Sequence, residues 1–263
     1  MTRPLPATQA LHAARDTAIE QLLAQHPVLL EVGRLFSGAG FEVDLVGGSV
    51  RDAILGREVD DLDFATDARP PKVARMLAGW ADAVWDVGAR FGTIGAEKDG
   101  IRLEFTTYRA DRYQPDSRKP EVEYAGDLLS DLGRRDFTVN AMALRLPDVQ
   151  FIDPFDGLLD LAVGRLRTPG LPTDSFSDDP LRMLRAARFA SQLAMTVDPQ
   201  AVAAMADMAE RIDVVSAERI RDELVKKGMA YSPERGLVGF TVPTFDDYLR
   251  RVIPEPPPRK AKA

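Results

Sequence analysis

Apolar and polar residues alternate along four short stretches in the first half of the chain. Side chains of a β-strand point to opposite faces in turn, so this period of two predicts strands with one buried face and one polar face. An Asp99-Gly100 pair lies between the last two stretches and favours a tight hairpin. The predicted strands are FEVDLV at 41–46, DLDFA at 61–65, and the stretches 92–98 and 101–107.

Helical patterns lie between and after these strands, where apolar residues recur at intervals of three and four. Glycines end two of these patterns and prolines begin a third, as is usual at helix ends. A mixed sheet with flanking helices, followed by helices, is an α+β fold. The predicted helices are an N-terminal arm at 1–26, then 27–38, 49–56 and 70–80, and an Arg-rich region that begins near residue 177.

Four further segments complete the prediction. Residues 110–126 are polar and contain two prolines, which predicts a mobile loop. DFTVNAMALRL at 136–146 begins with a helical pattern and ends with an extended one, and DPFDG at 153–157 predicts a turn. The final ten residues, PEPPPRKAKA, have the composition of a disordered tail.

Composition narrows the range of chemistry. The chain has 263 residues, no cysteine and two histidines, so disulfides, zinc–thiolate sites and thiol catalysis are excluded. A formal net charge of -7 argues against general coating of nucleic acid, although it allows a local basic groove. No apolar run suits a signal peptide or approaches the roughly 18 residues of a membrane span, so we expect a cytoplasmic protein.

Two carboxylates on one strand give the first candidate for catalysis. Asp61 and Asp63 are two residues apart, so both project from one strand face while Leu62 and Phe64 face the core. Two such carboxylates repel each other unless a cation lies between them, and hard oxygen ligands suit Mg²⁺. Sites of this kind can hold two metal ions for in-line phosphoryl transfer. The alternative is an exposed face with ordinary solvated acids.

A glycine turn precedes the carboxylates. Gly47-Gly48-Ser49 leads from a strand into a helix, and glycines there let the backbone approach a triphosphate. Arg51, on the first helical turn, can contact phosphate. The alternative is a tight strand–helix turn with a surface arginine, and neither the P-loop pattern nor the dinucleotide-binding pattern is present.

A third carboxylate, Glu104, lies on the polar face of the predicted strand IRLEFTTY. It could act beside the first two, as a metal ligand or as the base for a 3′-hydroxyl. An exposed strand glutamate without a catalytic role is about as well supported by the sequence.

Five motifs occur in order along the chain. Together they resemble the class II tRNA nucleotidyltransferases (CCA-adding enzymes) and the bacterial poly(A) polymerases, over roughly residues 27 to 226. The family usually has Glu-Asp where this chain has Asp178-Asp179. The motifs are LVGGSVRDAILGREVDDLDFAT at 45–66, EFTTYR at 104–109, DLGRRDFTVNAMAL at 131–144, DDPLRMLRAARFASQL at 178–193 and VVSAERIRDEL at 214–224.

The resemblance implies roles for individual residues. Asp61 and Asp63 would hold magnesium, and Gly48 and Arg51 would bind the triphosphate. The resemblance further implies that Arg135 contacts the nucleotide, that Asp136 and Asn140 shape its pocket, that Asp179 and Arg182 read the base, and that Arg185 and Arg188 line the nucleotide site.

Hydrogen-bond chemistry supports the base-reading role. Cytosine and adenine each present an exocyclic amine beside a ring-nitrogen acceptor, which a carboxylate and a guanidinium match as acceptor and donor. Uracil and guanine present the reverse pattern and would be rejected. We expect Ser177 to be the N-cap of the helix that carries Asp179 and Arg182, with Pro180 in its first turn. The alternative is a common i, i+3 salt bridge on a solvated helix.

The resemblance also implies an organisation into segments. It implies a polymerase-β-type nucleotidyltransferase head at 27–166 and a helical neck at 167–226. The N-terminal arm at 1–26 precedes them, and an atypical tail at 227–263 departs from the family. In this tail, residues 225–251 weakly resemble the end of a winged-helix domain.

Three functions remain open at this point. The leading hypothesis is addition of CMP and AMP from CTP and ATP to the 3′ end of tRNA, with Mg²⁺ as cofactor. Poly(A) polymerase is the nearest alternative, since it shares the motifs. The third hypothesis is a nucleotide- or RNA-binding module with little turnover, because the family resemblance stops near residue 226.

Overall fold

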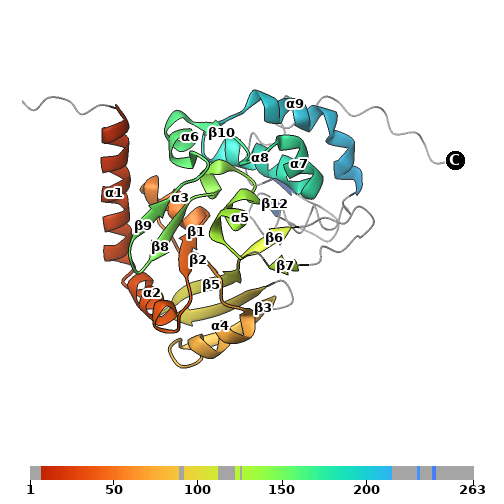
Figure 1. Cartoon of the computed structure of the whole chain (residues 1–263). Helices are drawn as coiled ribbons and strands as arrows, with labels where there is room; N and C mark the ends of the chain where they lie inside the picture. Colours follow the sequence, from red (N-terminus) through yellow and green to blue (C-terminus); the bar gives the residue numbers. More distant parts are fainter. Residues whose placement is uncertain are drawn as a thin grey trace, which may run out of the picture. The chain divides into compact units, whose positions relative to one another are not determined.

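A computed structural model of the chain describes residues 7–88, 92–111, 122–124, 126–214, 230–231 and 239–240. Two compact units divide the chain, Met1–Ala162 and Val163–Ala263. Helices and strands follow the sequence in Figure 1 from α1 at the N-terminal end to the short strands near the C-terminal end. The predicted boundaries of head, neck and tail remain predictions.

The first unit is built on a seven-stranded sheet in the order β3-β4-β5-β2-β1-β8-β9 (Figure 1). Strands β2 and β5 pair in parallel, whereas the other neighbouring pairs are antiparallel. This mixed sheet confirms the predicted α+β class. The strands are β1 Val43–Val46, β2 Asp61–Thr66, β3 Ala83–Gly88, β4 Thr93–Lys98, β5 Ile101–Thr107, β8 Ala143–Leu146 and β9 Gln150–Ile152.

The predicted helices of this unit are present with small changes at their ends. The segment 136–146 starts as a short 3₁₀-helix and ends in β8, as predicted. Asp99 and Gly100 both have positive φ in the hairpin turn between β4 and β5, which explains the turn residues found there. The helices are α1 Ala7–Gln25, α2 Val28–Gly38, α3 Gly48–Ile54, α4 Pro70–Leu77, α5 Leu128–Gly133, η2 Thr138–Asn140 and α6 Gly157–Val163.

The two faces of the sheet are packed unequally. The larger core lies on the face against α2 and α4, where the ring centroid of Phe105 is 4.7 Å from that of Phe64 and 5.3 Å from that of Phe36. On the opposite face a smaller cluster lies under α5, and this cluster is confined to the β2, β1 and β8 part of the sheet. Its members are Val46, Ala65, Tyr108, Leu128, Leu132, Ala141 and Ala143.

Several elements of this unit differ from the sequence prediction. Strands β3 and β9 and helices α5 and α6 have no counterpart in that prediction. The predicted loop at 110–126 is wrong at both ends, because β6, Arg109–Asp111, pairs with β7, Val122–Tyr124. Backbone hydrogen bonds between these distant segments outweigh their polar composition, whereas residues 112–121 lie outside the described part of the chain.

The second unit is mainly helical among its described residues. A short parallel pair joins β10, Arg165–Leu166, to β11, Thr196–Val197. An antiparallel pair joins β12, Ala230–Tyr231, to β13, Gly239–Phe240. The helices are α7 Pro172–Asp178, α8 Leu181–Gln192, α9 Pro199–Asp207 and the 3₁₀-helix η3 Ala209–Val214.

The predicted N-cap at Ser177 is wrong. Helix α7 begins earlier, at Pro172, so Ser177 lies inside α7, and α8 starts only at Leu181. The N-cap of α8 is Pro180, and the preceding Asp179 is the C-cap of α7. The Asp179 carboxylate accepts a hydrogen bond of 3.1 Å from the Leu181 backbone N–H.

Some predictions lie outside the described residues. They are the motif after residue 214, the disordered tail, and most of the winged-helix segment. A search of the described helices finds none that is long and apolar enough to span a membrane.

Candidate active site

The two carboxylates of β2 lie on one face of the sheet, as predicted. Asp61 and Asp63 are exposed, whereas Leu62 and Phe64 between and after them are buried. In the parallel pairing of β2 with β5, Glu104 is the register partner of Asp63. The pairing therefore brings the three sequence-predicted carboxylates onto neighbouring positions of one face.

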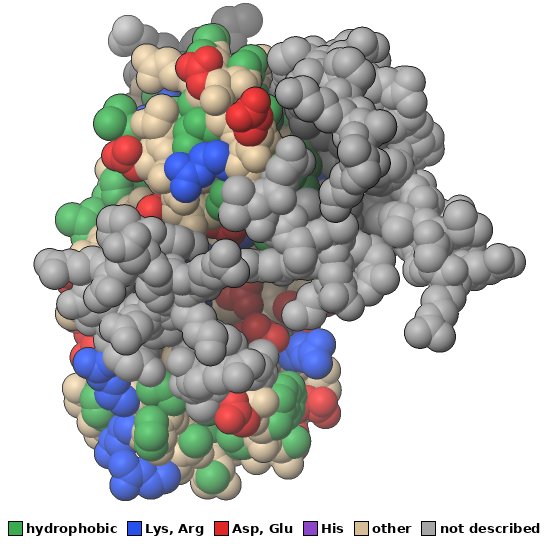
Figure 2. Space-filling model, turned by 90° about the vertical axis from the view of Figure 1, so that its right-hand side faces the viewer, with side chains coloured by type: hydrophobic (Ala, Val, Ile, Leu, Met, Phe, Trp, Pro, Cys, Tyr) green, Lys and Arg blue, Asp and Glu red, His purple; other side chains and the backbone are tan. Residues whose placement is uncertain are grey.

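The cluster changes the acidity of its central member. Desolvation is the largest cause that raises the pKa of Asp63, to about 6, and the charges of Glu104 and Asp61 act in the same direction, whereas Arg135 opposes them. Asp63 keeps contact with solvent, yet protein atoms surround it at longer range and displace much of the water that would stabilise its charge. The mutual repulsion of Asp61, Asp63 and Glu104 favours binding of a cation among them. Figure 2 shows acidic side chains in a recess near the middle of the face in view.

The glycine turn is tied directly to the carboxylate strand. The Ser49 hydroxyl donates to the Asp61 carbonyl oxygen at 3.0 Å and accepts from the Asp63 backbone N–H at 3.2 Å. Gly47 has a φ of 72°, and a Cβ at this position would lie 2.8 Å from Nη1 of Arg135. Only glycine fits both conditions without strain. The turn, the carboxylates and Arg135 are therefore neighbours.

Arg51 lies at the centre of a hydrogen-bonded chain. Its guanidinium donates to both carboxylate oxygens of Asp52, at 3.0 and 2.6 Å, and to the side-chain oxygen of Asn140. Asn140 in turn donates to the Asp136 carboxylate at 2.9 Å. The structure thus brings together three residues that the sequence assigned to nucleotide binding from two distant motifs. Arg51 is only 8% exposed, so its planar group is fixed in direction.

Asp131 fixes the direction of the Arg135 guanidinium by hydrogen bonding. Its buried carboxylate accepts a hydrogen bond of 3.0 Å from Arg135 and one of 2.9 Å from Arg134. Burial raises the pKa of Asp131, but the charges of Arg135 and Arg134 outweigh it and lower the pKa overall. An ionised Asp131 therefore orients both arginines.

The second unit carries the sequence-predicted base-reading residues. The Asp179 carboxylate accepts from the first backbone N–H of α8, and Arg182 in α8 donates to the Ser175 hydroxyl of α7 at 2.9 Å. Arg185 follows one turn later on α8, and the guanidinium of Arg188 lies 4.2 Å from the Phe189 ring centroid. Arg182 is buried at 8% exposure, so a neighbouring helix holds it rather than bulk solvent.

Sequence reasoning missed three residues that hold the site together, namely Ser49, Asp52 and Asp131. Each acts through a contact with a predicted residue. Ser49 and Asp52 adjoin Gly48 and Arg51 in the sequence, so their neighbours gave a usable signal. The burial of Asp131 has no such signal, since it depends on the packing of α5.

Comparison with known families assigns the first unit. A model of the poly A polymerase head domain matches residues 43–167, which contain the carboxylates, the glycine turn and the Arg135–Asn140 segment. This segment of the chain is similar to the poly A polymerase head domain. A second model, of a domain of unknown function (DUF8462), matches residues 185–249.

Curated relatives match most of this chain over about half of their own length. The CCA-adding enzyme of Levilactobacillus brevis is 40% identical over 220 residues, which are 83% of this chain and 54% of the relative. The CCA-adding enzyme of Enterococcus faecalis is 38% identical over 215 residues, covering 81% of this chain and 51% of the relative. This chain therefore spans about half the length of these relatives.

Solved structures give the same likeness. The Bacillus stearothermophilus CCA-adding enzyme in complex with CTP has a TM-score of 0.67 and 34% identity, over 75% of this chain and 47% of that chain. A tRNA nucleotidyltransferase complexed with a primer tRNA and an incoming ATP analog has a TM-score of 0.62 and 32% identity, over 76% of this chain and 56% of that chain. The predicted polymerase-β-type fold of the head domain is confirmed.

Proposed function

We propose that this chain is a template-independent nucleotidyltransferase that adds CMP and AMP, from CTP and ATP, to the 3′ end of tRNA. The observation that carries the proposal is the connection through Ser49. It fixes a glycine turn suited to phosphates beside two carboxylates suited to a divalent cation. The names of the relatives, CCA-adding enzymes, supply the substrate. Because tRNA is a cytoplasmic substrate, we place the activity in the cytoplasm.

Different residues of the first unit would bind the triphosphate and accept the proton of the attacking hydroxyl. The backbone of the Gly47–Gly48 turn, together with Arg51 and Arg135, would hold the triphosphate. The Gly47 N–H already donates to the Met142 carbonyl oxygen at 3.3 Å, so Gly47 would contribute its conformation and not a donor. Since Arg51 and Arg135 are already oriented by carboxylate and amide partners, little freedom is lost when phosphate binds. Glu104 lies across from Asp63, where it could accept the proton of the attacking 3′-hydroxyl.

Asp61 and Asp63 fit a magnesium site completed by substrate. Both are exposed on one strand face, and desolvation, followed by repulsion from Glu104 and Asp61, raises the pKa of Asp63. Among the described residues, no group of three or more His, Cys, Asp or Glu side chains is arranged to hold a metal ion. The remaining ligands would be phosphate oxygens and water, as is usual for Mg²⁺. Bound Mg²⁺ would neutralise charge on the reacting phosphates.

Base choice would come from the second unit. Asp179 can accept from the exocyclic amine of cytosine or adenine, and Arg182 can donate to the adjacent ring nitrogen. The hydrogen bond from Arg182 to Ser175 would limit the directions open to the guanidinium. A fixed donor and acceptor reject uracil and guanine because buried polar groups would be mismatched.

The test uses tRNA transcripts without their 3′-terminal CCA. The full chain is incubated with Mg²⁺ and each labelled NTP in turn, and products are read on a sequencing gel. We expect incorporation from CTP and ATP, and little from UTP or GTP. Long tails made of AMP, with no incorporation from CTP, would identify a poly(A) polymerase instead.

Variants of the carboxylates test the catalytic assignment. Asp61→Ala and Asp63→Ala should each lower incorporation by at least about 100-fold, because the charge on the reacting phosphates would be less well neutralised. Asp60→Ala is the matched control, since Asp60 is an exposed acid just before the same strand. Full activity of either β2 variant would remove the metal site from the proposal.

A further inference from the structure

Trp85 lies in one row with the catalytic carboxylates. It is on β3, the edge strand of the sheet, where its register partner on β4 is Gly95. Gly95 is the partner of Glu104 on β5, and Glu104 is the partner of Asp63 on β2. Register partners share a sheet face, so the Trp85 indole belongs to the catalytic face, about 14 Å along it from Asp63.

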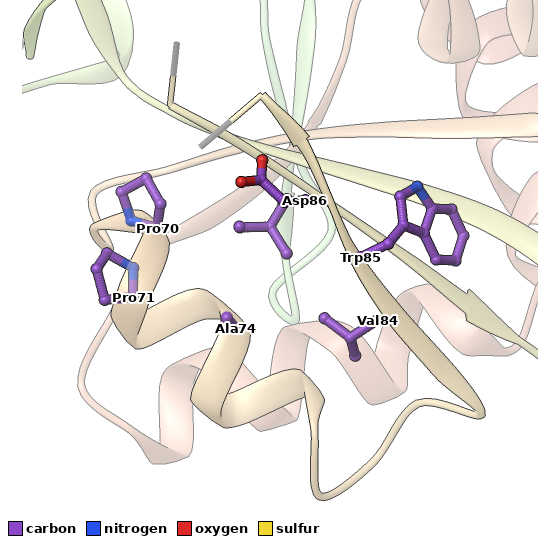
Figure 3. A pocket seen from close by; sticks show the side chains of 7 residues that line it. Pro70, Pro71, Ala74, Val84, Trp85 and Asp86 are labelled. Carbon is purple, nitrogen blue, oxygen red and sulfur yellow. The ribbon is translucent and has the colours of Figure 1, made fainter. Parts of the chain in front are cut away.

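The close view of β3 supports this orientation. In Figure 3, Val84 and Asp86 point toward helix α4, while the Trp85 ring points away from that helix. The cavity on the α4 side, of ≈ 520 Å³, is lined by Pro70, Pro71, Ala74 and Ile94 and by Val84, Trp85 and Asp86 of β3. Trp85 thus contributes to this lining, while its ring projects from β3 on the side opposite to Val84.

Among the described residues, the close helix packing on this part of the sheet comes from the core face. Helix α4 contacts β3, β4 and β5 there, and the small cluster under α5 lies on the strands on the other side of the carboxylates. Trp85 is half-buried and Arg102 is exposed. The guanidinium carbon of Arg102 lies 5.9 Å from the Trp85 ring centroid.

The site leaves one direction for the RNA. The groups proposed to hold the triphosphate, Gly47, Arg51 and Arg135, lie on the β1 side of the carboxylates. In-line attack requires the nucleophile and the leaving pyrophosphate to lie on opposite sides of the reacting phosphorus. The 3′-hydroxyl of the primer then approaches over β5, β4 and β3, the strands that carry Glu104, Gly95 and Trp85.

We propose that Trp85, with Arg102 beside it, is a stacking subsite for an unpaired base near the 3′ end of the RNA primer. The inference rests on the proposed function, because it requires a primer at Asp63. An indole face binds any base by stacking, and a neighbouring guanidinium can contact the phosphate of the same nucleotide. Gly95 has no side chain, so the row between the ring and Glu104 stays free of a side chain from β4. The subsite holds the primer without selecting its sequence.

The first experiment pairs a protein variant with a change in the RNA. Steady-state kinetics compare the full chain with Trp85→Leu and Trp85→Phe, on a tRNA transcript without CCA. Leucine keeps an apolar side chain but cannot stack, so we expect the KM for RNA to rise about 5- to 50-fold. Phenylalanine should stay within about threefold, because it retains an aromatic face. The kcat at saturating RNA and the KM for CTP should not change.

Abasic RNA then identifies the partner of the ring. The base is removed from one of the last three nucleotides of the transcript at a time. One abasic position should weaken binding to the full chain by a similar factor, and the same change should have no effect on Trp85→Leu. Additive losses at every position, or a raised KM for CTP in place of RNA, would overturn the subsite.

Intrinsic fluorescence gives a reading that is independent of turnover. The chain contains two tryptophans, Trp80 and Trp85. In Trp80→Phe only Trp85 remains. Stacking of a base should quench its emission when the variant is titrated with the transcript that retains all of its bases. Incorporation of nucleotide without quenching would refute the subsite and leave the proposed function intact. Absence of both RNA binding and incorporation in the unaltered chain would refute the proposed function as well.

Discussion

Asp131 shows how one buried residue sets the geometry of two others. It is 1% exposed, and its partners Arg134 and Arg135 keep about a fifth of their side-chain surface exposed to solvent. Arg135 in turn reaches over Gly47, where a Cβ would collide with it. A single carboxylate thus connects the stability of the head with the shape of the phosphate turn.

Replacement of Asp131 should cost stability in a pH-dependent way. Asp131→Asn keeps the shape but removes the buried negative charge that Arg134 and Arg135 both contact, so we expect about 2 kcal/mol or more of lost unfolding free energy at pH 7. The pKa of Asp131 is lowered in the folded state, so its contribution is complete above the unfolded value of about 3.9 and is lost as the pH falls through the folded value. Urea unfolding of both proteins between pH 7 and pH 3 measures the difference.

The control for this prediction is Asp16→Asn. Asp16 has 59% of its side chain exposed and pairs with its neighbour Arg15, so its change should stay within about 0.5 kcal/mol. A deficit in Asp131→Asn that persists undiminished at pH 3 would show that the loss comes from packing and not from charge.

At the scale of elements, sequence patterns were informative where the pattern was local. The alternation in β2 predicted the shared face of Asp61 and Asp63, and Asp99-Gly100 predicted the hairpin. Strand β3 and the β6–β7 pair escaped prediction because strands at an edge, or of three residues, depend on hydrogen bonds to partners distant in sequence. Ser177 was wrongly assigned as a cap because Pro172 begins a helix five residues earlier.

Helix α6 and the 3₁₀-helix η2 give an element-scale prediction. A Cβ on Gly157, at the start of α6, would lie 2.2 Å from the Thr138 carbonyl oxygen of η2. Gly157→Ala should therefore displace η2, which carries Asn140, and cost about 1–3 kcal/mol of stability with a matching fall in incorporation. Thermal unfolding and the tRNA assay measure the two effects.

Gly79→Ala is the comparison for that variant. A Cβ there meets no atom within 4 Å, so both stability and incorporation should be close to those of the unaltered chain. Equal behaviour of the two variants would mean that η2 tolerates the displacement.

At the scale of the whole molecule, the head contains its own core. Every residue in the two apolar clusters of the sheet lies before residue 162, the end of the first unit. Both tryptophans also lie in that unit. Tryptophan emission therefore reports on the unfolding of the head, whereas far-ultraviolet circular dichroism reports on both units.

This arrangement predicts that residues 1–162 fold when expressed alone. We expect one cooperative urea transition in tryptophan emission, with a midpoint close to that of the full chain, because every described member of the two apolar clusters is retained. A fragment without a cooperative transition, or with a much lower midpoint, would show that the head depends on residues after 162.

The alternation along β2 also has a consequence for how such a chain can change over time. Leu62 and Phe64 are buried in the core, whereas Asp61 and Asp63 are the exposed carboxylates proposed to hold the metal ion. Selection for folding and selection for turnover therefore act on different positions of one six-residue strand. Substitutions at the buried positions can accumulate while the two carboxylates are kept. Loss of the carboxylates should in turn leave the protein folded. A lineage could in this way keep the scaffold while abandoning the chemistry, one substitution from an enzyme to a binding protein.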